Sequence, residues 1–85
     1  MAYRILITKK ARHDIEGLEE TVKKRLGKKL LHVTRQGDIR PLVKQLVDSR
    51  IGEYRLRIGD YRVLFDLEGT TIIILRVQHR KDVYR

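Results

Sequence analysis

Residues 53–66 read EYRLRIGDYRVLFD, and this stretch decides the fold. Side chains alternate on both sides of Gly59-Asp60, which is the pattern of two strands joined by a tight turn. Glycine at the first central position suits a type II′ turn, and a two-residue turn fixes the register of the strands. The predicted cross-strand pairs are Ile58 with Tyr61, Arg57 with Arg62, Leu56 with Val63, and Tyr54 with Phe65. One face of this β-hairpin is therefore apolar and aromatic.

The other face of the hairpin carries three arginines, Arg55, Arg57 and Arg62. Like charges directly opposite each other destabilise a sheet, and a guanidinium cannot relieve the repulsion by losing its proton. An anion between the arginines would remove the repulsion, and phosphate matches their planar fork best. We therefore predict a phosphate-binding face, against the simpler interpretation that the three side chains spread into water.

The composition is that of a small basic protein, with 85 residues, a net charge of +9, a pI near 10.3 and no cysteine. So short a chain has room for one modest core, so we expect one domain over residues 1–85. The charge indicates a polyanionic partner, most simply a nucleic acid. An anionic membrane is the weaker alternative, because no basic segment carries a large aromatic face. No membrane span or signal peptide is visible, and a cytoplasmic protein is expected.

The segments before the hairpin alternate between strand and helix. Residues 3–7 are rich in β-favouring side chains and predict a short strand. Thr8 is placed to cap a helix over residues 9–17. Residues 38–52 fit either a helical turn opened by Pro41 or an ordered loop.

A longer helix is predicted over residues 19–34, and with the first helix it forms an αα-hairpin. Its apolar stripe consists of Val22, Leu26, Leu30 and Val33. Gly27 is costly in the middle of a helix, and we expect it to permit a close approach of the first helix or the sheet. The opposite face carries Lys24 and Lys28 with Lys29 beside them. This basic face is either merely solvated or a footprint for a large nucleic acid.

Residues 71–77 form an apolar run without alternation, which is typical of a strand covered on both faces. The order β-α-α-β-β-β predicts an α+β fold, a small antiparallel sheet with the helical hairpin packed on one face. We expect residues 3–7 to pair with this last strand. The side of the sheet without helices then offers apolar surface to a protein partner. Lys44 precedes the hairpin and can reach its arginine face.

The hairpin motif over 54–65, the apolar strand and the tail His79-Arg-Lys-Asp-Val-Tyr84 together resemble the RelE/ParE superfamily of type II toxin–antitoxin toxins. The resemblance covers nearly the whole chain and favours the RelE branch, because the tail keeps both its histidine and its tyrosine. It implies a ribosome-dependent endoribonuclease that cuts mRNA in the A site. The 2′-hydroxyl attacks the adjacent phosphate and leaves a 2′,3′-cyclic phosphate and a 5′-hydroxyl, with no metal or cofactor.

The resemblance also implies partners. A small cognate antitoxin, RelB-like with an acidic amphipathic C-terminal segment, would silence the toxin. Ribosome and mRNA would be the targets, and operator DNA would be contacted only through the antitoxin. The sequence contains neither paired carboxylates nor a histidine cluster of the kind that binds a metal, so we expect no metal site.

The reaction needs a base for the 2′-hydroxyl, an acid for the leaving 5′-oxygen, and positive charge for the phosphorane. Arg57 and Arg62 fit the charged role, with Arg55 behind them. By resemblance, Arg62 corresponds to the phosphate-binding arginine of the family. Tyr84 corresponds to the tail tyrosine that orients the nucleotide, and Arg80 to a tail arginine that neutralises the leaving side.

The residue that acts as general base is not assigned by the resemblance. Some relatives have lysines where this chain has Arg55 and Arg57, and arginine cannot take their place as a base. His79 is the best substitute because its ordinary pKa lies near neutrality; the alternative is a strand-end histidine without a role. Two other functions stay open: a ParE-like toxin that acts on DNA gyrase without cleavage, and a non-enzymatic basic nucleic-acid-binding module. The tail favours the ribonuclease.

Overall fold

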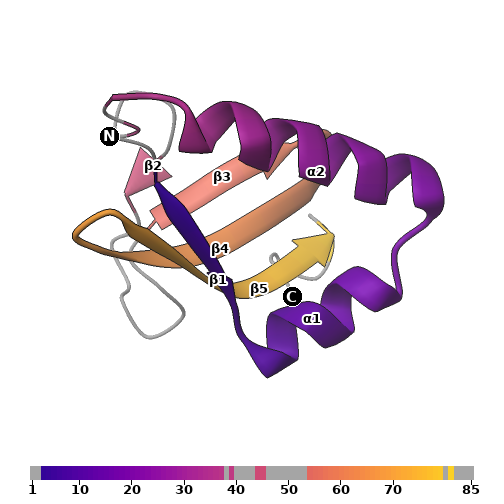
Figure 1. Ribbon diagram of the computed structural model, residues 1–85. Coiled ribbons are helices and arrows are strands. Elements are labelled where there is room, and N and C mark those ends of the chain that lie inside the picture. Colours follow the sequence, from indigo (N-terminus) through magenta and orange to yellow (C-terminus); the bar gives the residue numbers. More distant parts are fainter. Residues whose placement is uncertain (1–2, 38, 40–43, 46–53, 80, 82–85) are drawn as a thin grey trace.

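The computed structural model describes residues 3–37, 39, 44–45, 54–79 and 81, and it shows a sheet with two helices on one face (Figure 1). The sheet has five strands in the order β1-β5-β4-β3-β2. The elements are β1 (Arg4–Ile7), α1 (Lys9–Glu16), α2 (Glu20–Thr34), β2 (Lys44–Gln45), β3 (Tyr54–Ile58), β4 (Tyr61–Glu68) and β5 (Thr71–His79). The predicted α+β class and element order are confirmed, with the two-residue β2 as an addition.

The sheet is mixed, which corrects the antiparallel sheet expected from the sequence. The pairs β2–β3, β3–β4 and β4–β5 are antiparallel, but β1 runs parallel to β5 with Arg4 opposite Thr71 and Ile7 opposite Ile74. The pairing of these two strands was predicted correctly. Their direction was not, because a hydrophobic pattern reports which face of a strand is buried and carries no information on its direction. A parallel pair needs a long crossover connection, and here both helices and the hairpin lie between the two strands.

The β3–β4 hairpin has the predicted register, from Tyr54 opposite Phe65 to Ile58 opposite Tyr61. Gly59 has a φ of 58°, whereas Asp60 has no positive φ. Positive φ at the first central position alone is what a type II′ turn requires. The turn residues therefore hold Arg57 directly opposite Arg62.

Thr8 joins the sheet to the first helix. Its backbone N–H and its hydroxyl both donate to the carbonyl of Ile74, at 3.1 and 2.8 Å. The same hydroxyl accepts a hydrogen bond from the Ala11 amide at 3.3 Å, so it caps α1 as predicted. One side chain thus ends β1 and begins α1.

The α2 stripe is buried through Leu26, Leu30 and Val33, as its spacing predicts. The interpretation of Gly27 was wrong, because a Cβ at this position would meet nothing within 4 Å. Gly27 is exposed to solvent on the outer side of the helix. No close contact compensates for its low helix propensity.

A β-bulge divides β5 into two parts. Phe65 lies opposite Ile74, whereas the preceding Leu64 lies opposite Arg76, so Leu75 is the extra residue. The bulge shifts the alternation by one residue, and Val77 joins Ile74 in the core although the two are three residues apart. The bulge explains the spacing of three between the buried residues Ile74 and Val77.

Both helices contribute to the same core. Its buried side chains are Ala11, Leu26, Leu30, Val33, Ile39, Leu56, Ile58, Val63, Phe65, Ile72, Ile74 and Val77. The strand residues in this set define the helix-covered face of the sheet. Their neighbours along β3 and β4, including the arginines, belong to the opposite face.

Candidate functional site

The arginines of the hairpin lie on the face of the sheet that the helices leave open. Arg57 and Arg62 are directly opposite each other, and Arg55 precedes Arg57 by two residues on the same face. In an antiparallel pair, directly opposed residues have Cβ atoms about 4.5–5.5 Å apart. The register therefore brings two guanidinium side chains to one place, as predicted.

The three arginines differ in their exposure. Arg57 is exposed and Arg55 is half-buried. Arg62 has only 4% of its surface exposed and makes interactions within the protein. The alternation predicted an open row of three, so the burial of Arg62 is a difference from the expected site. Arg57 is the member of the opposed pair that faces solvent.

Two further rows of the sheet extend this site. In register, β2 places Lys44 directly opposite Arg55; that Lys44 joins the arginine face stays a prediction. On the other side of Arg62, β5 places Gln78 directly opposite it. Gln78 was missed from the sequence, because its place beside Arg62 depends on the bulge at Leu75. The spacing of three between Ile74 and Val77 was the available signal.

His79 lies on the other face of the sheet. It is opposite Tyr61 in register, and the two rings meet edge to face with centroids 5.0 Å apart and an interplanar angle of 87°. Tyr61 packs against the core on the helix-covered face. The sheet therefore separates the His79 ring from Arg57 and Arg62, in contrast to the predicted convergence on one phosphate.

The remaining predicted residues fall into two groups. Arg80 and Tyr84 lie outside the described residues. Lys24 and Lys28 are exposed on α2 and Lys29 is half-buried there. Because α2 covers the opposite face of the sheet, these lysines form a basic surface separate from the arginine face.

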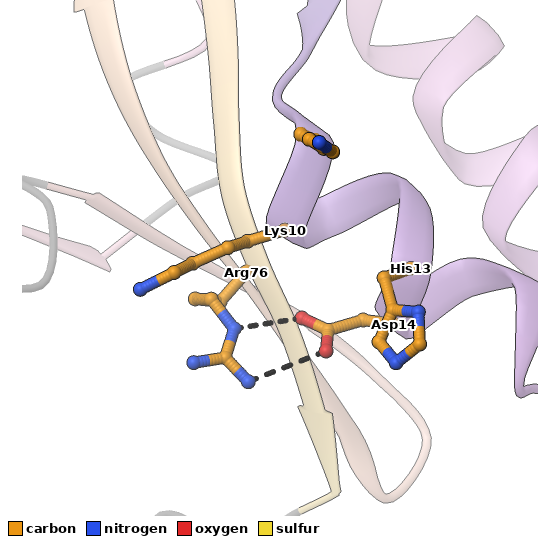
Figure 2. Close-up of a pocket in the computed structure, with 5 residues that line it drawn as sticks. Lys10, His13, Asp14 and Arg76 are labelled. Atoms are coloured by element: carbon orange, nitrogen blue, oxygen red, sulfur yellow. Dashed lines mark hydrogen bonds and ion pairs between the residues drawn. The ribbon is translucent and has the colours of Figure 1, made fainter.

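An ion pair fastens α1 to the second half of β5 (Figure 2). The Arg76 guanidinium donates to both carboxylate oxygens of Asp14, at 2.8 and 3.3 Å, and the Val77 amide donates to the same carboxylate at 2.9 Å. The β1–β5 pairing ends at Ile74, so Asp14 supplies an acceptor to the strand edge beyond it. Burial alone would raise the pKa of Asp14, but these hydrogen bonds and the charges of Arg76 and His13 hold it below its ordinary 3.8.

Beside this ion pair is an open hollow of about 380 Å³. It is lined by Lys9, Lys10, His13, Asp14 and Arg76 (Figure 2). Because Asp14 is already bonded to Arg76 and Val77, the two lysines leave the hollow positively charged. Within the described ranges, no three His, Asp or Glu side chains gather as a metal-binding group. Of the helices in those ranges, none is long and apolar enough to cross a membrane.

Comparison with known proteins places these features in a family. The sequence profile of the ParE toxin of type II toxin-antitoxin system, parDE, matches residues 5–84. The chain belongs to this family. Its membership of the RelE/ParE toxin superfamily, predicted from the hairpin and the tail, is thereby confirmed.

Individual relatives of this RelE/ParE-family chain carry RelE-type names. It is 52% identical over 31 residues to Toxin RelE3 of Methanocaldococcus jannaschii and 46% identical over 48 residues to Toxin RelG of Mycobacterium tuberculosis. The matched segments span 36% and 54% of this chain, and 35% and 51% of those relatives. Thus the chain spans about a third to a half of their lengths.

The fold is that of a solved toxin. In the crystal structure of the toxin-antitoxin complex RelBE2 from Mycobacterium tuberculosis, one chain superposes with a TM-score of 0.81 and 28% identity. The superposition covers 94% of this chain and 100% of that chain. In this RelE/ParE-family chain, the two motifs that carry the family likeness meet physically, through Tyr61 of the hairpin and His79 of the tail.

Proposed function

We propose that this protein is the toxin of a type II toxin–antitoxin pair and that it cleaves mRNA in the ribosomal A site. The observation that carries the proposal is the directly opposed pair Arg57 and Arg62, held by the turn at Gly59. Arg57, the exposed member of the pair, has its guanidinium in solvent, where it would bind a phosphodiester. The names of the relatives support an RNA-cleaving toxin, because RelE-family toxins are generally endoribonucleases.

The proposed chemistry is transfer of the phosphate to the neighbouring 2′-hydroxyl. The 2′-oxygen forms a bond to phosphorus while the bond to the 5′-oxygen breaks. This leaves a 2′,3′-cyclic phosphate, and the 5′-oxygen takes up a proton. Arg57 would stabilise the charge on the phosphorane, and donors of this kind change rates by about 10²–10³-fold. Arg62 has only 4% of its surface exposed, so it would take the same role only after becoming exposed. Arg55 and Lys44 would bind the flanking phosphates, Arg80 would neutralise the leaving side, and Tyr84 would orient the nucleotide.

Among the described residues, the candidate general base His79 lies away from the arginine face. His79 could take the 2′-hydroxyl proton only if its ring left Tyr61 and came round the sheet to the arginine face. A general base has to lie within hydrogen-bond reach of the proton that it abstracts. The assignment of His79 as the base therefore remains a prediction that needs a rearrangement.

We further propose a cognate antitoxin as the partner of this toxin. The related RelBE2 structure is a toxin-antitoxin complex. The net charge of +9 favours an acidic partner. Leu6 on β1 is 55% exposed and lies opposite Ile73 of β5, so the open face also offers apolar surface. An acidic amphipathic segment fits both features.

The second candidate is a toxin that acts on DNA gyrase without cleaving RNA. It is favoured by the ParE family match and by the packing of His79 away from the arginines. Adding the purified protein to programmed ribosomes and, in parallel, to a gyrase supercoiling reaction separates the two. If the protein is the ribonuclease, the mRNA is cut in the A site and carries a 2′,3′-cyclic phosphate, and supercoiling by gyrase is normal. Intact mRNA with inhibited supercoiling would decide for the gyrase toxin.

A further inference from the structure

The hairpin contacts the end of β5 through more than the two rings that pack edge to face. The His79 ring stands edge to face against Tyr61, at 5.0 Å between centroids. Its Nδ1 also accepts a hydrogen bond from the backbone amide of Lys81, at 3.2 Å. The ring is therefore held by β4 on one side and holds the chain just beyond β5 on the other.

This hydrogen bond assigns the tautomer of His79. A neutral imidazole has one nitrogen that donates and one that accepts. Because Nδ1 accepts from Lys81, the proton of the neutral ring is on Nε2. The only basic lone pair of the neutral ring is then engaged by the Lys81 amide, so His79 would have to give up this hydrogen bond before it could act as a general base.

A side chain that accepts from the amide two residues later is a known turn-forming device. Asn and Asp make it with their Oδ1 atoms, and it fixes the direction of the backbone between the two residues. Here Nδ1 of His79 takes that part, at the point where the chain leaves β5. The residues that follow include Arg80 and Tyr84, which the proposed function places in the reaction.

We propose that His79 is a positioning residue for cleavage and not its general base: Tyr61 holds its ring, and its Nδ1 holds the backbone amide of Lys81. The expected effect of His79 on cleavage depends on the proposed function. The contact between His79 and Lys81 is independent of that function. Misplacement of a reacting group by about 1 Å can cost roughly 10²-fold in rate, so a single backbone contact can matter.

Three substitutions at one position test this role. Asn places its Oδ1 where Nδ1 was, Gln carries its oxygen farther out as Nε2 was, and Ala has no acceptor. None of the three can act as a base near neutral pH. A positioning role therefore predicts that His79→Asn retains function, whereas a base role predicts that all three variants fail alike.

The first measurement is hydrogen exchange of the Lys81 amide in the free protein, which needs no ribosome. We expect slow exchange in the parent and in His79→Asn, and exchange at least about 3-fold faster in His79→Ala and His79→Gln. The amides of β5 between Thr71 and Val77 serve as the internal control for folding. Equal exchange of Lys81 in all four proteins would overturn the proposed contact.

The second measurement is single-turnover mRNA cleavage at saturating ribosome concentration. We expect His79→Ala and His79→Gln to lose about 10–100-fold in rate, and His79→Asn to stay within about 3-fold of the parent. Ribosome affinity should be unchanged in all three. A rate for His79→Asn as low as that of His79→Ala would refute the positioning role even if the Lys81 amide is protected. No cleavage by the parent would refute the proposed function and leave the exchange result standing.

Discussion

Arg57 and Arg62 are held opposite each other by a turn and not by any attraction between them. Replacing the exposed Arg57 by Gln removes the repulsion and keeps most of the side chain. We expect the Arg57→Gln variant to gain roughly 0.2–1 kcal/mol in the free energy of unfolding. Urea denaturation measures it, with Arg12→Gln on the exposed surface of α1 as the matched loss of one positive charge. A variant less stable than the parent would show that the arginine pair is not strained.

The Asp14 carboxylate predicts a pH dependence. Its pKa is below the ordinary value in the folded protein, so its contribution to stability is present above about pH 4 and is lost as the pH falls through the folded pKa. Asp14→Asn should cost about 1–3 kcal/mol at pH 7, and the difference from the parent should shrink at pH 3 and below. The exposed Glu16→Gln on the same helix is the control. A difference that does not change with pH would mean that the charge of Asp14 is unimportant.

At the scale of elements, the helices and the hairpin could be predicted because each is a local pattern. The hairpin register follows from two turn residues, and α1 and α2 follow from a cap and an apolar stripe. The parallel β1–β5 pair and the bulge at Leu75 could not, because both depend on which strands meet. The place of Gln78 beside Arg62 was missed for the same reason.

Gly27 gives a prediction at this scale. A Cβ there meets open space, so Gly27→Ala should raise the free energy of unfolding by about 0.5–1 kcal/mol through helix propensity. Gly59→Ala is the contrasting variant and should destabilise, because Gly59 has a φ of 58° and a Cβ there would lie 3.4 Å from the Arg25 guanidinium. Thermal unfolding of both variants is sufficient. Destabilisation by Gly27→Ala would indicate a contact on this face of α2.

In the whole molecule, two basic surfaces lie on opposite sides of the sheet. The arginine face is the one that the helices do not cover, and the lysines of α2 lie on the helical layer. We expect Lys24→Gln with Lys28→Gln to reduce the salt slope of ribosome binding by about 1–2 and to leave the single-turnover cleavage rate unchanged. The slope of log affinity against log salt concentration is measured between roughly 50 and 200 mM salt. Phosphate contacts weaken strongly over this range. An unchanged slope would mean that this surface is merely solvated.

The opposed arginines of the hairpin are proposed to stabilise charge on an mRNA phosphate, with the exposed Arg57 in direct contact. The direct test is single-turnover cleavage on programmed ribosomes by the parent, Arg57→Gln and the control Arg12→Gln, each shown to be folded. The account predicts that Arg57→Gln cleaves about 10²–10³-fold more slowly with its ribosome affinity retained, while Arg12→Gln cleaves at the parent rate. Cleavage by folded Arg57→Gln at the parent rate would contradict it.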